Sequence, residues 1–497
     1  MYRHIPTQTL RPLIFLLLLL LIPAGCTSRK TSIREETYAR LDAIRDRKEG
    51  QLNRYMAKIE ANAHAIGTDS KMVHLFEDKH RIYSSWHGQT PPVNAQQELL
   101  RIRNAIEDIY IEKYLAFHDI LFIDHGGDIF YTVRKKSDYH KNIFDGDLAE
   151  TALSRQLRKH PEGGFVDFEN YRIAGEPSSF FVVPTNNSGE NGGWFVLQFS
   201  INKINEMFSL EEGLGSTGEV FLVNRERAML TDSRFFADST VLRQHLSSEN
   251  ISAKFAEREG HKLIIDYRNF PALTSFKVVQ VLGHQWLLIA KIDEDEVITN
   301  GYRRDSNQLL LRMEKMVQQE PGSYRTINHN GGREIEVDMD EFRRVTGPGG
   351  EIYTHGVRTC TAVLISYPGR FSYMAHISPN DRIYGGESTD LIGIMMKRID
   401  DFDLVRTEKR HLQVAIISPQ PNYTTNVVDA FTEWGIFLSQ IKLVLNPQAR
   451  HANISHDYKS GKTVIEWELV GGNGGREALL ADLPTLGDLM KQLVAAK

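Results

Sequence analysis

The chain of 497 residues is long enough for about three domain-sized units, at roughly 150 residues each. Its 59 basic and 64 acidic residues give a net charge of −5 without a basic block, which argues against a nucleic acid partner. Hydrophobic residues make up 41% and charged residues 25% of the chain, as in an ordinary globular protein.

The amino terminus has the pattern of an export signal. Arg3 and Arg11 supply positive charge, and the apolar run over residues 13–22 is too short to span a bilayer comfortably. The run ends in Ile22-Pro23-Ala24-Gly25-Cys26, which resembles the bacterial lipoprotein signal, in which a peptidase cuts before a cysteine that carries lipid. An ordinary signal peptide or an uncleaved anchor is the alternative.

The lipoprotein resemblance implies a location. Residues 1–25 are then the signal peptide, Cys26 carries the lipid, and residues 26–34 tether the protein to a membrane. Thr27, in place of an aspartate, favours the outer over the inner membrane. We therefore expect a lipid-anchored protein of the cell envelope that faces the periplasm.

The first half of the chain has the pattern of a long helix followed by strands. Apolar residues between Glu35 and Ile66 recur largely at three- and four-residue steps, which predicts a helix, and a second helix is expected over about residues 96–116. Apolar stretches bounded by turn residues predict strands over 119–124, 129–133, 165–168, 179–183, 193–199 and 220–223, with a helix over 201–208 before the last of them.

Several separated motifs in this half resemble the double Cache family, the tandem PAS-like extracellular sensors of chemoreceptors and sensor kinases. They are Leu121-Phe122-Ile123-Asp124 with Gly127 and Tyr131, Lys136 and Asp138, Phe180 and Pro184 before Leu197-Gln198, the run over 215–223, and Asp232-Ser233-Arg234-Phe235. The resemblance implies an α+β fold with two PAS-like modules over residues 35–297 that bind a small molecule.

The resemblance also suggests where a ligand binds and how the chain assembles. The candidate pocket residues are Tyr131, Asp167, Tyr171, Phe180 and Gln198, and each of them is alternatively a core or hairpin-surface residue. By analogy with receptors, the long amino-terminal helix is expected to form a homodimer.

In this family a membrane-spanning helix usually follows the second module. Here residues 297–316 contain Asn300, Arg303, Arg304, Asp305, Arg312, Glu314 and Lys315, so they cannot cross a membrane. We expect a short connecting helix and a linker over residues 298–323. Whatever the sensor controls is then expected on the same side of the membrane.

A cysteine and a histidine flank a predicted hairpin in the second half. Residues 361–367 and 371–377 have the composition of strands, and Pro368-Gly369-Arg370 is a turn signal. Cys360 precedes the first strand and His376 lies near the end of the second, so the hairpin can bring them side by side. A histidine that accepts the thiol proton makes cysteine a nucleophile at neutral pH. The alternative is that Cys360 is a small buried hydrophobe.

The elements around the hairpin predict an α+β sandwich over residues 324–478. They are a helix over 391–402, a strand over 412–417, a helix over 424–438, a strand over 441–445 and a strand pair around 463–469. A short amphipathic helix is expected over 479–497, packed on the surface. His451 and His456 are expected to be surface residues, since their spacing matches no metal-binding motif.

This region resembles the CheD family, the chemotaxis receptor glutamine deamidases, which share a fold with bacterial toxins that deamidate glutamine. The matching steps are Arg358-Thr359-Cys360-Thr361-Ala362-Val363 and Met374-Ala375-His376-Ile377, and Thr354 stands at the family's third catalytic position, six residues before the cysteine. The resemblance implies a Cys360, His376 and Thr354 triad that hydrolyses a glutamine side-chain amide of an envelope protein or peptide, without a metal or cofactor. A non-catalytic sensor that retains only the fold, and an amidase with another substrate, are the alternatives.

Overall fold

The structure is a computed structural model that describes residues 33–86, 90–173, 175–185, 192–209, 213–317, 333–347, 350–378, 391–404, 406–419, 424–469, 472–479 and 482–495. The predicted signal peptide, Cys26 and the end of the predicted linker, residues 318–323, lie outside the described residues.

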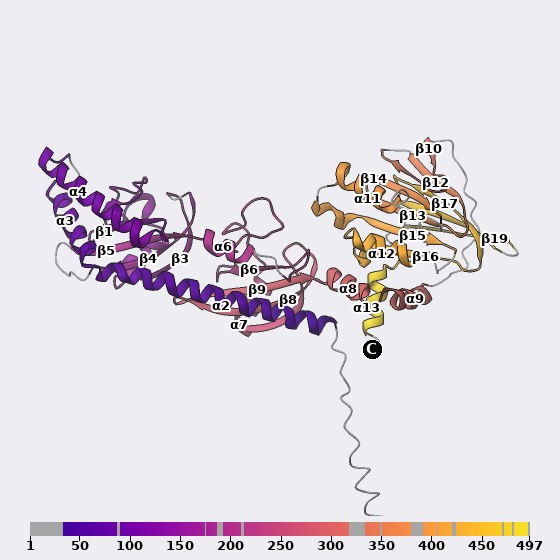
Figure 1. Ribbon diagram of the computed structural model, residues 1–497, viewed down its shortest axis with the longest axis horizontal. Helices are drawn as coiled ribbons and strands as arrows, with labels where there is room; N and C mark the ends of the chain where they lie inside the picture. The colour runs from indigo at the N-terminus through magenta and orange to yellow at the C-terminus, as the bar shows by residue number, and fades with distance from the viewer. Residues whose placement is uncertain are drawn as a thin grey trace, which may run out of the picture.

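One long helix organises the first half of the molecule. α2 (Ile33–Thr68) contains the predicted helix and runs along two successive sheets (Figure 1). Its buried side chains follow the expected helical steps: Leu41, Ile44, Leu52, Met56, Ile59, Ala63 and Ile66. Because a single helix covers both sheets, the two sheets share one apolar core along it.

The first sheet is antiparallel throughout. Its strand order is β2 (Ile129–Thr132), β1 (Asp119–Asp124), β5 (Gly193–Ser200), β4 (Glu176–Pro184) and β3 (Gly164–Tyr171). The helices α3 (Ser70–Trp86) and α4 (Val93–Ile109) pack together at this end of the molecule, and a short π-helical segment, η1 (Tyr110–Tyr114), extends α4. The strands agree with the prediction, whereas α3 was not predicted. The segment between β2 and β3 contains η2 (Gly146–Leu148) and α5 (Ala152–Lys159).

The second sheet is also antiparallel and has four strands. Its order is β6 (Glu219–Val223), β9 (His284–Asp293), β8 (Pro271–Val281) and β7 (Glu259–Ile265), with α6 (Asn202–Ser209) before it and α7 (Ser248–Glu257) between β6 and β7. Only β6 and α6 were predicted. The first half is thus an α+β unit in which antiparallel sheets pack on an amino-terminal helix.

Two helices, not one, connect the halves. α8 (Glu294–Arg303) ends before Asp305, whose backbone leaves the helical conformation (φ −153°, ψ 43°), and α9 (Ser306–Met316) begins after it. The Asp305 carbonyl accepts the Leu309 N–H at 3.1 Å, so Asp305 begins a new helix. Among the helices that the structure describes, none is long and apolar enough to be a membrane span.

The second half is a sandwich of two five-stranded sheets. One sheet has the order β10 (Arg333–Glu336), β12 (Gly350–Val357), β17 (Ala449–Asp457), β18 (Lys462–Leu469) and β19 (Gly472–Leu479). The other has the order β11 (Glu341–Val345), β14 (Phe371–Ile377), β13 (Thr361–Tyr367), β15 (Gln413–Ser418) and β16 (Ile441–Leu445). The α+β sandwich that we predicted is therefore present.

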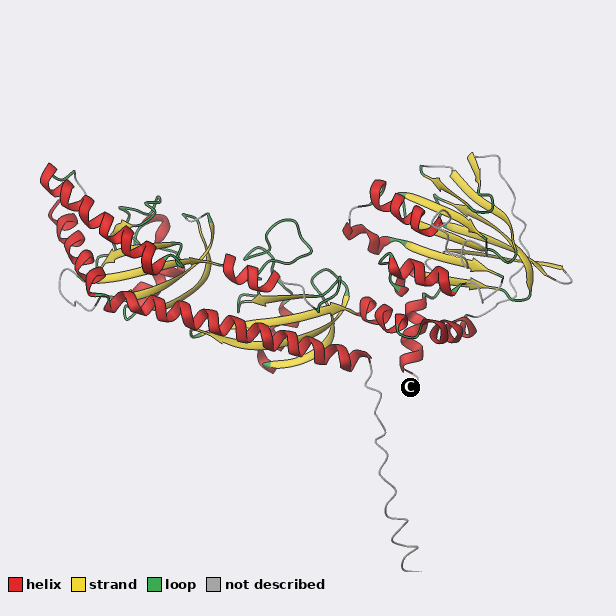
Figure 2. Ribbon diagram, viewed as in Figure 1, coloured by secondary structure: helices red, strands yellow, loops and turns green. Residues whose placement is uncertain are grey.

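Helices cover the outer face of the β11-β14-β13-β15-β16 sheet (Figure 2). They are α11 (Leu391–Phe402), α12 (Thr425–Glu433), α9 and α13 (Leu486–Ala495), with the short 3-10 segments η3 (Arg406–His411) and η5 (Leu438–Gln440) between them. The inner face of this sheet packs on the other sheet through a separate core.

The predicted carboxy-terminal helix needs correction. Residue 479 belongs to β19, which pairs with β18 along its whole length, and the helix begins only at Leu486. α13 contacts α8 and α9, and its Leu486 and Met490 side chains are buried. It therefore packs at the junction of the two halves, because its apolar side fills the space between the connecting helices and the sandwich.

Candidate functional site

The imidazole of His376 is held by Thr354 across the two sheets of the sandwich. Thr354 Oγ1, on β12, lies 2.8 Å from His376 Nδ1, on β14, and 2.7 Å from the carbonyl oxygen of Val337. A carbonyl oxygen only accepts, so the single hydroxyl proton of Thr354 goes to Val337, and Thr354 Oγ1 accepts the Nδ1–H of His376. The lone pair of the neutral imidazole is then on Nε2.

Cys360 shares the inner face of the sheet with His376. The predicted hairpin is confirmed with its predicted bounds, and Ala362 is the cross-strand partner of His376. Cys360 lies two residues before Ala362, and both pack in the core between the sheets. Cys360 itself lies in the bend just before β13. The structure thus brings Thr354 and His376 into hydrogen-bonding distance and places Cys360 in the same core between the sheets.

Two further residues hold the ends of the hairpin and were not recognised from the sequence. The Asp340 N–H donates to the His376 carbonyl oxygen at 2.7 Å, and Asp340 Oδ1 accepts the Ser378 N–H at 2.9 Å. The Ser418 hydroxyl donates to the Cys360 carbonyl oxygen at 3.3 Å. Asp340 has a φ of 62°, in the left-handed region, which aspartate adopts more readily than most residues do. The residue type was therefore the sequence signal that could have indicated this turn.

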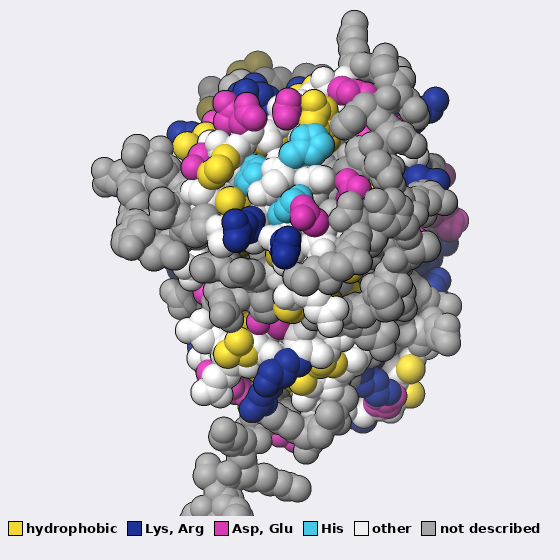
Figure 3. Space-filling view, turned by 90° about the vertical axis from the view of Figure 1, so that its right-hand side faces the viewer, with side chains coloured by type: hydrophobic (Ala, Val, Ile, Leu, Met, Phe, Trp, Pro, Cys, Tyr) yellow, Lys and Arg dark blue, Asp and Glu magenta, His cyan; other side chains and the backbone are white. Residues whose placement is uncertain are grey.

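The site is largely closed to solvent. Cys360 is 6% exposed and His376 is 3% exposed. Figure 3 views the molecule from the end formed by the sandwich, where histidine side chains lie at the centre of the face beside lysine, arginine and acidic side chains. Within the described parts of the chain, no three His, Cys, Asp or Glu side chains are arranged to hold a metal ion.

His456 differs from its prediction as a surface residue. It is fully buried in β17, where Nε2 lies 3.1 Å from Ser372 Oγ and Nδ1 lies 3.1 Å from Thr463 Oγ1. Burial lowers the pKa of His456 to about 4. A neutral imidazole satisfied by two hydroxyl groups is a structural element of the core.

The five residues predicted to bind a ligand in the first half of the chain do not all lie in one place. Tyr171 and Phe180 pack against each other on one face of the first sheet, with ring centroids 5.0 Å apart. Gln198 is the cross-strand partner of Phe180 and lies on the same face. Tyr131 packs instead in the core on the helix side of the sheet, and Asp167 accepts the indole N–H of Trp286 at 3.0 Å. The structure therefore brings together three of the five residues.

Two buried carboxyl groups, those of Asp119 and Asp138, are associated with Tyr171, Phe180 and Gln198. The Tyr171 hydroxyl donates to Asp138 Oδ2 at 3.1 Å, and burial raises the pKa of Asp138. Burial also raises the pKa of Asp119 to about 6, although the Ile120 and Arg134 N–H groups donate to its Oδ1. Polar groups buried within an apolar core at this cost are candidates for a functional site.

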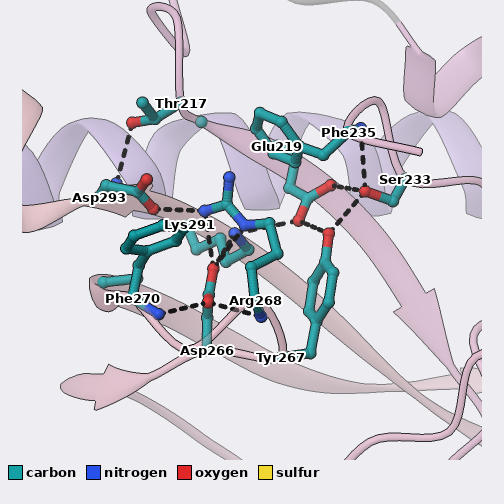
Figure 4. Close-up of polar contacts among 12 residues, drawn as sticks. Thr217, Glu219, Ser233, Phe235, Asp266, Tyr267, Arg268, Phe270, Lys291 and Asp293 are labelled. Atoms are coloured by element: carbon teal, nitrogen blue, oxygen red, sulfur yellow. Dashed lines mark hydrogen bonds and ion pairs between the residues drawn. The ribbon is translucent and has the colours of Figure 1, made fainter. Parts of the chain in front are cut away.

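A second network of buried charges lies in the second sheet (Figure 4). Lys291 Nζ lies 2.6 Å from Asp266 Oδ2 and 3.1 Å from Glu219 Oε1. Arg268 bridges Asp266, at 2.7 Å, and Asp293, at 2.5 Å. Each of the three carboxylates lies within 3.1 Å of one of the two cations, so the buried charges are paired, with one negative charge in excess within this sheet.

The network continues into the sandwich. Arg410 Nη1 lies 2.6 Å from Asp293 Oδ2, and the Arg410 guanidinium lies 3.9 Å from the centre of the Phe270 ring. Burial raises the pKa of Asp293, and Arg268 and Arg410 oppose this by their positive charge. The sensor and the sandwich are therefore joined by a buried ion pair.

No protein-family model and no curated protein matches the chain. Among solved structures, the chain is similar to an extracellular ligand binding receptor from Desulfohalobium retbaense, with 14% identity over 49% of this chain and 40% of that chain, at a TM-score of 0.30. It is also similar to the ligand-binding domain of the amino acid chemoreceptor PctB of Pseudomonas aeruginosa in complex with L-Gln, with 14% identity over 57% of this chain and 100% of that domain, at a TM-score of 0.34.

A third neighbour is the ligand-binding domain of the chemoreceptor CtaA of Pseudomonas fluorescens in complex with L-leucine, with 14% identity over 52% of this chain and 99% of that domain, at a TM-score of 0.29. These neighbours are a ligand binding receptor and two ligand-binding domains of chemoreceptors.

Proposed function

We propose that this chain is an exported sensor of a small molecule, anchored through lipid on Cys26, whose sandwich domain hydrolyses an amide with Cys360 as the nucleophile. One observation carries the catalytic part. The Thr354 hydroxyl donates to Val337 and accepts from His376 Nδ1, which leaves Nε2 as the basic nitrogen of His376. Ala362, the cross-strand partner of His376, packs in the core that also contains Cys360.

The reaction is an acyl transfer. His376 Nε2 takes the thiol proton, and the Cys360 sulfur forms a bond to the carbon of a side-chain carboxamide. The C–N bond then breaks as Nε2–H returns the proton to the departing ammonia, which leaves a thioester. Water, deprotonated by His376, attacks the thioester, and the sulfur leaves with its electron pair to regenerate the thiol form of the enzyme. The products are ammonia and a carboxylate.

Thr354 is a positioning residue in this scheme. Its oxygen accepts from Nδ1 both in the neutral imidazole and in the imidazolium, so the ring keeps one orientation through both proton transfers. The resemblance of the sequence around Cys360 and His376 to the CheD family supports glutamine side chains of a protein or peptide as the substrate class.

The sensor part rests on the tandem antiparallel sheets and on the polar group buried in the first of them. Asp119 and Asp138 are buried, and Asp138 accepts a hydrogen bond from the Tyr171 hydroxyl. Two carboxyl groups kept out of water in this way suit a ligand that carries an amino group, because its positive charge repays their desolvation.

The test is the pH dependence of Cys360 alkylation by iodoacetamide in the full-length chain in detergent, followed at that residue by mass spectrometry. We expect the thiol to react with an apparent pKa well below the usual value of about 8.5. His376→Ala should abolish this reactivity at neutral pH. His355→Ala, an exposed histidine on the neighbouring strand β12, should leave it unchanged.

The alternative function is that of a non-catalytic sensor. The observation that favours it is the position of Cys360 in the apolar core between the sheets. A thiol that reacts only after unfolding would establish this alternative and exclude the acyl transfer. Deamidation of glutamine peptides, measured as ammonia release, would then be absent as well.

A further inference from the structure

A buried lysine without a partner lies at the far end of the first sheet. Lys79, on α3, is 7% exposed. Among the residues that the structure describes, it has no carboxylate within ion-pair distance and no hydrogen-bond acceptor. A lysine that is buried to this extent usually pairs with an anion or a hydrogen-bond acceptor.

The surroundings of Lys79 do not replace the missing anion. Its Nζ lies 5.6 Å from the centre of the Tyr131 ring, which offers only a weak attraction. The charged groups that act on its pKa, Lys135 and Arg103, are both positive. Burial and then these two cations lower the pKa of Lys79 to about 8, so the side chain is still largely charged at neutral pH.

Lys79 lines a cavity of about 260 Å³ whose walls are aromatic. Tyr83 and His140 stack with ring centroids 5.7 Å apart and an angle of 17°, and Tyr139 lies 3.7 Å from His140. Trp86, which is 40% exposed, also lines the cavity. The cavity therefore combines the lysine side chain with aromatic rings in its wall, at a size that suits a small organic molecule.

We propose that this cavity binds a small monocarboxylate with an aromatic ring, whose carboxylate pairs with the Lys79 ammonium and whose ring packs against Tyr83 and Tyr139. The ion pair gives the Lys79 ammonium an anionic partner, and ring stacking adds shape selectivity.

An amino group on the ligand is not accommodated. The acidic residues near Tyr83 are Asp124 and Asp128. Asp124 Oδ2 lies 3.3 Å from His80 Nε2, and Asp128 Oδ1 accepts from the Asn142 side-chain amide at 2.7 Å. Since both carboxylates are engaged, a ligand with one negative charge fits better than a zwitterion.

This site is separate from the acid cluster around Asp138. Tyr131, beneath Lys79, packs in the core on the helix side of the first sheet, whereas Tyr171 packs on the opposite face. The proposal goes beyond the proposed function, because it assigns a second ligand site in the first half of the chain, and it is independent of the chemistry at Cys360. Binding can fail while Cys360 alkylation keeps its dependence on His376, so the two failures are distinguishable.

The test is isothermal titration calorimetry of the full-length chain in detergent with phenylacetate, phenylacetamide and phenylalanine. Phenylacetamide has the shape of phenylacetate without its charge. We expect phenylacetate to bind, and Lys79→Met to weaken it at least about tenfold, as expected for a buried charge-assisted pair. Lys71→Met, an exposed lysine on the same helix, is the matched control and should leave the affinity unchanged.

Three results would overturn the proposal. The first is no binding of phenylacetate at millimolar concentration to the wild-type chain. The second is equal affinity for phenylacetamide, or unchanged affinity in Lys79→Met, which would mean an apolar slot. The third is binding of phenylalanine that is tighter than that of phenylacetate and is weakened by Lys79→Met, which would mean that the cavity at Lys79 is an amino acid site. Tyr83→Leu, which removes one stacking ring and keeps Lys79, should also weaken phenylacetate and provides a second variant.

Discussion

Lys79→Met should stabilise the ligand-free protein, which is unusual for a change at a buried position. Methionine keeps an unbranched side chain of similar length and removes the charge. The pKa of Lys79 falls from 10.5 to about 8, and this difference of about 2.5 corresponds to about 3 kcal/mol of unfavourable free energy for the buried ammonium. Losing the contact with the Tyr131 ring costs about 1 kcal/mol. The net gain in the free energy of unfolding is about 2 kcal/mol.

The stability difference between Lys79→Met and the wild type should depend on pH. Between about pH 8 and 10.5, Lys79 is neutral in the folded chain and protonated in the unfolded chain, so wild-type stability rises with pH in that window. The advantage of Lys79→Met is therefore complete below about pH 8 and shrinks as the pH approaches 10.5.

Urea unfolding of the wild type and of Lys79→Met, followed by circular dichroism from neutral to alkaline pH, measures both effects. Lys71→Met should change the free energy of unfolding by less than about 0.5 kcal/mol, because its side chain is exposed. If Lys79→Met instead destabilised the chain by about 1 kcal/mol or more at neutral pH, the ammonium would have a favourable partner, and both this reasoning and the empty anion site would be refuted.

Three further changes test the sandwich and its junction. Thr354→Val removes the acceptor of the His376 Nδ1–H, and we expect the Cys360 alkylation rate at neutral pH to fall about tenfold, the equivalent of one hydrogen bond. Arg410→Ala leaves Asp293 buried with one cation fewer and should lower the free energy of unfolding by about 2 to 4 kcal/mol in urea. His456→Gln should remove an acid sensitivity of about 3 kcal/mol between pH 6.5 and about 4, because only the unfolded imidazole binds a proton there.

Matched controls separate these effects from general damage. Arg343→Ala removes an ion pair with Glu341 whose partners are 47% and 37% exposed, and it should cost less than about 0.5 kcal/mol. Equal effects of Arg343→Ala and Arg410→Ala would contradict the buried character of the junction. A wild-type chain that keeps its full stability down to about pH 4 would contradict the account of His456. Alkylation of Thr354→Val at the wild-type rate would mean that the Thr354 bond does not orient the imidazole.

The local sequence pattern was sufficient to predict an element where the residues of that element alone determine its structure. The strands β13 and β14 have the predicted bounds, because apolar, β-favouring residues run on both sides of Pro368-Gly369. The long helix α2 followed from its apolar steps. The break at Asp305 was missed, because the helical pattern of charged and apolar residues continues through it. α3 was missed because only Met72 and Phe76 of its apolar residues are fully buried, which is too sparse a pattern.

The sequence by itself determined that Cys360 and His376 flank one hairpin, because the register of a tight hairpin follows from its turn. Only the tertiary structure decided that Thr354, from the other sheet, donates to Val337 and orients the imidazole. Likewise, only the tertiary structure showed that Lys79 lies on a helix, α3, and that its ammonium group lies over the Tyr131 ring. The physical reason is that the chain's local preferences set which face of an element is apolar, whereas the packing of one sheet or helix on another decides which polar groups meet and which are left without a partner.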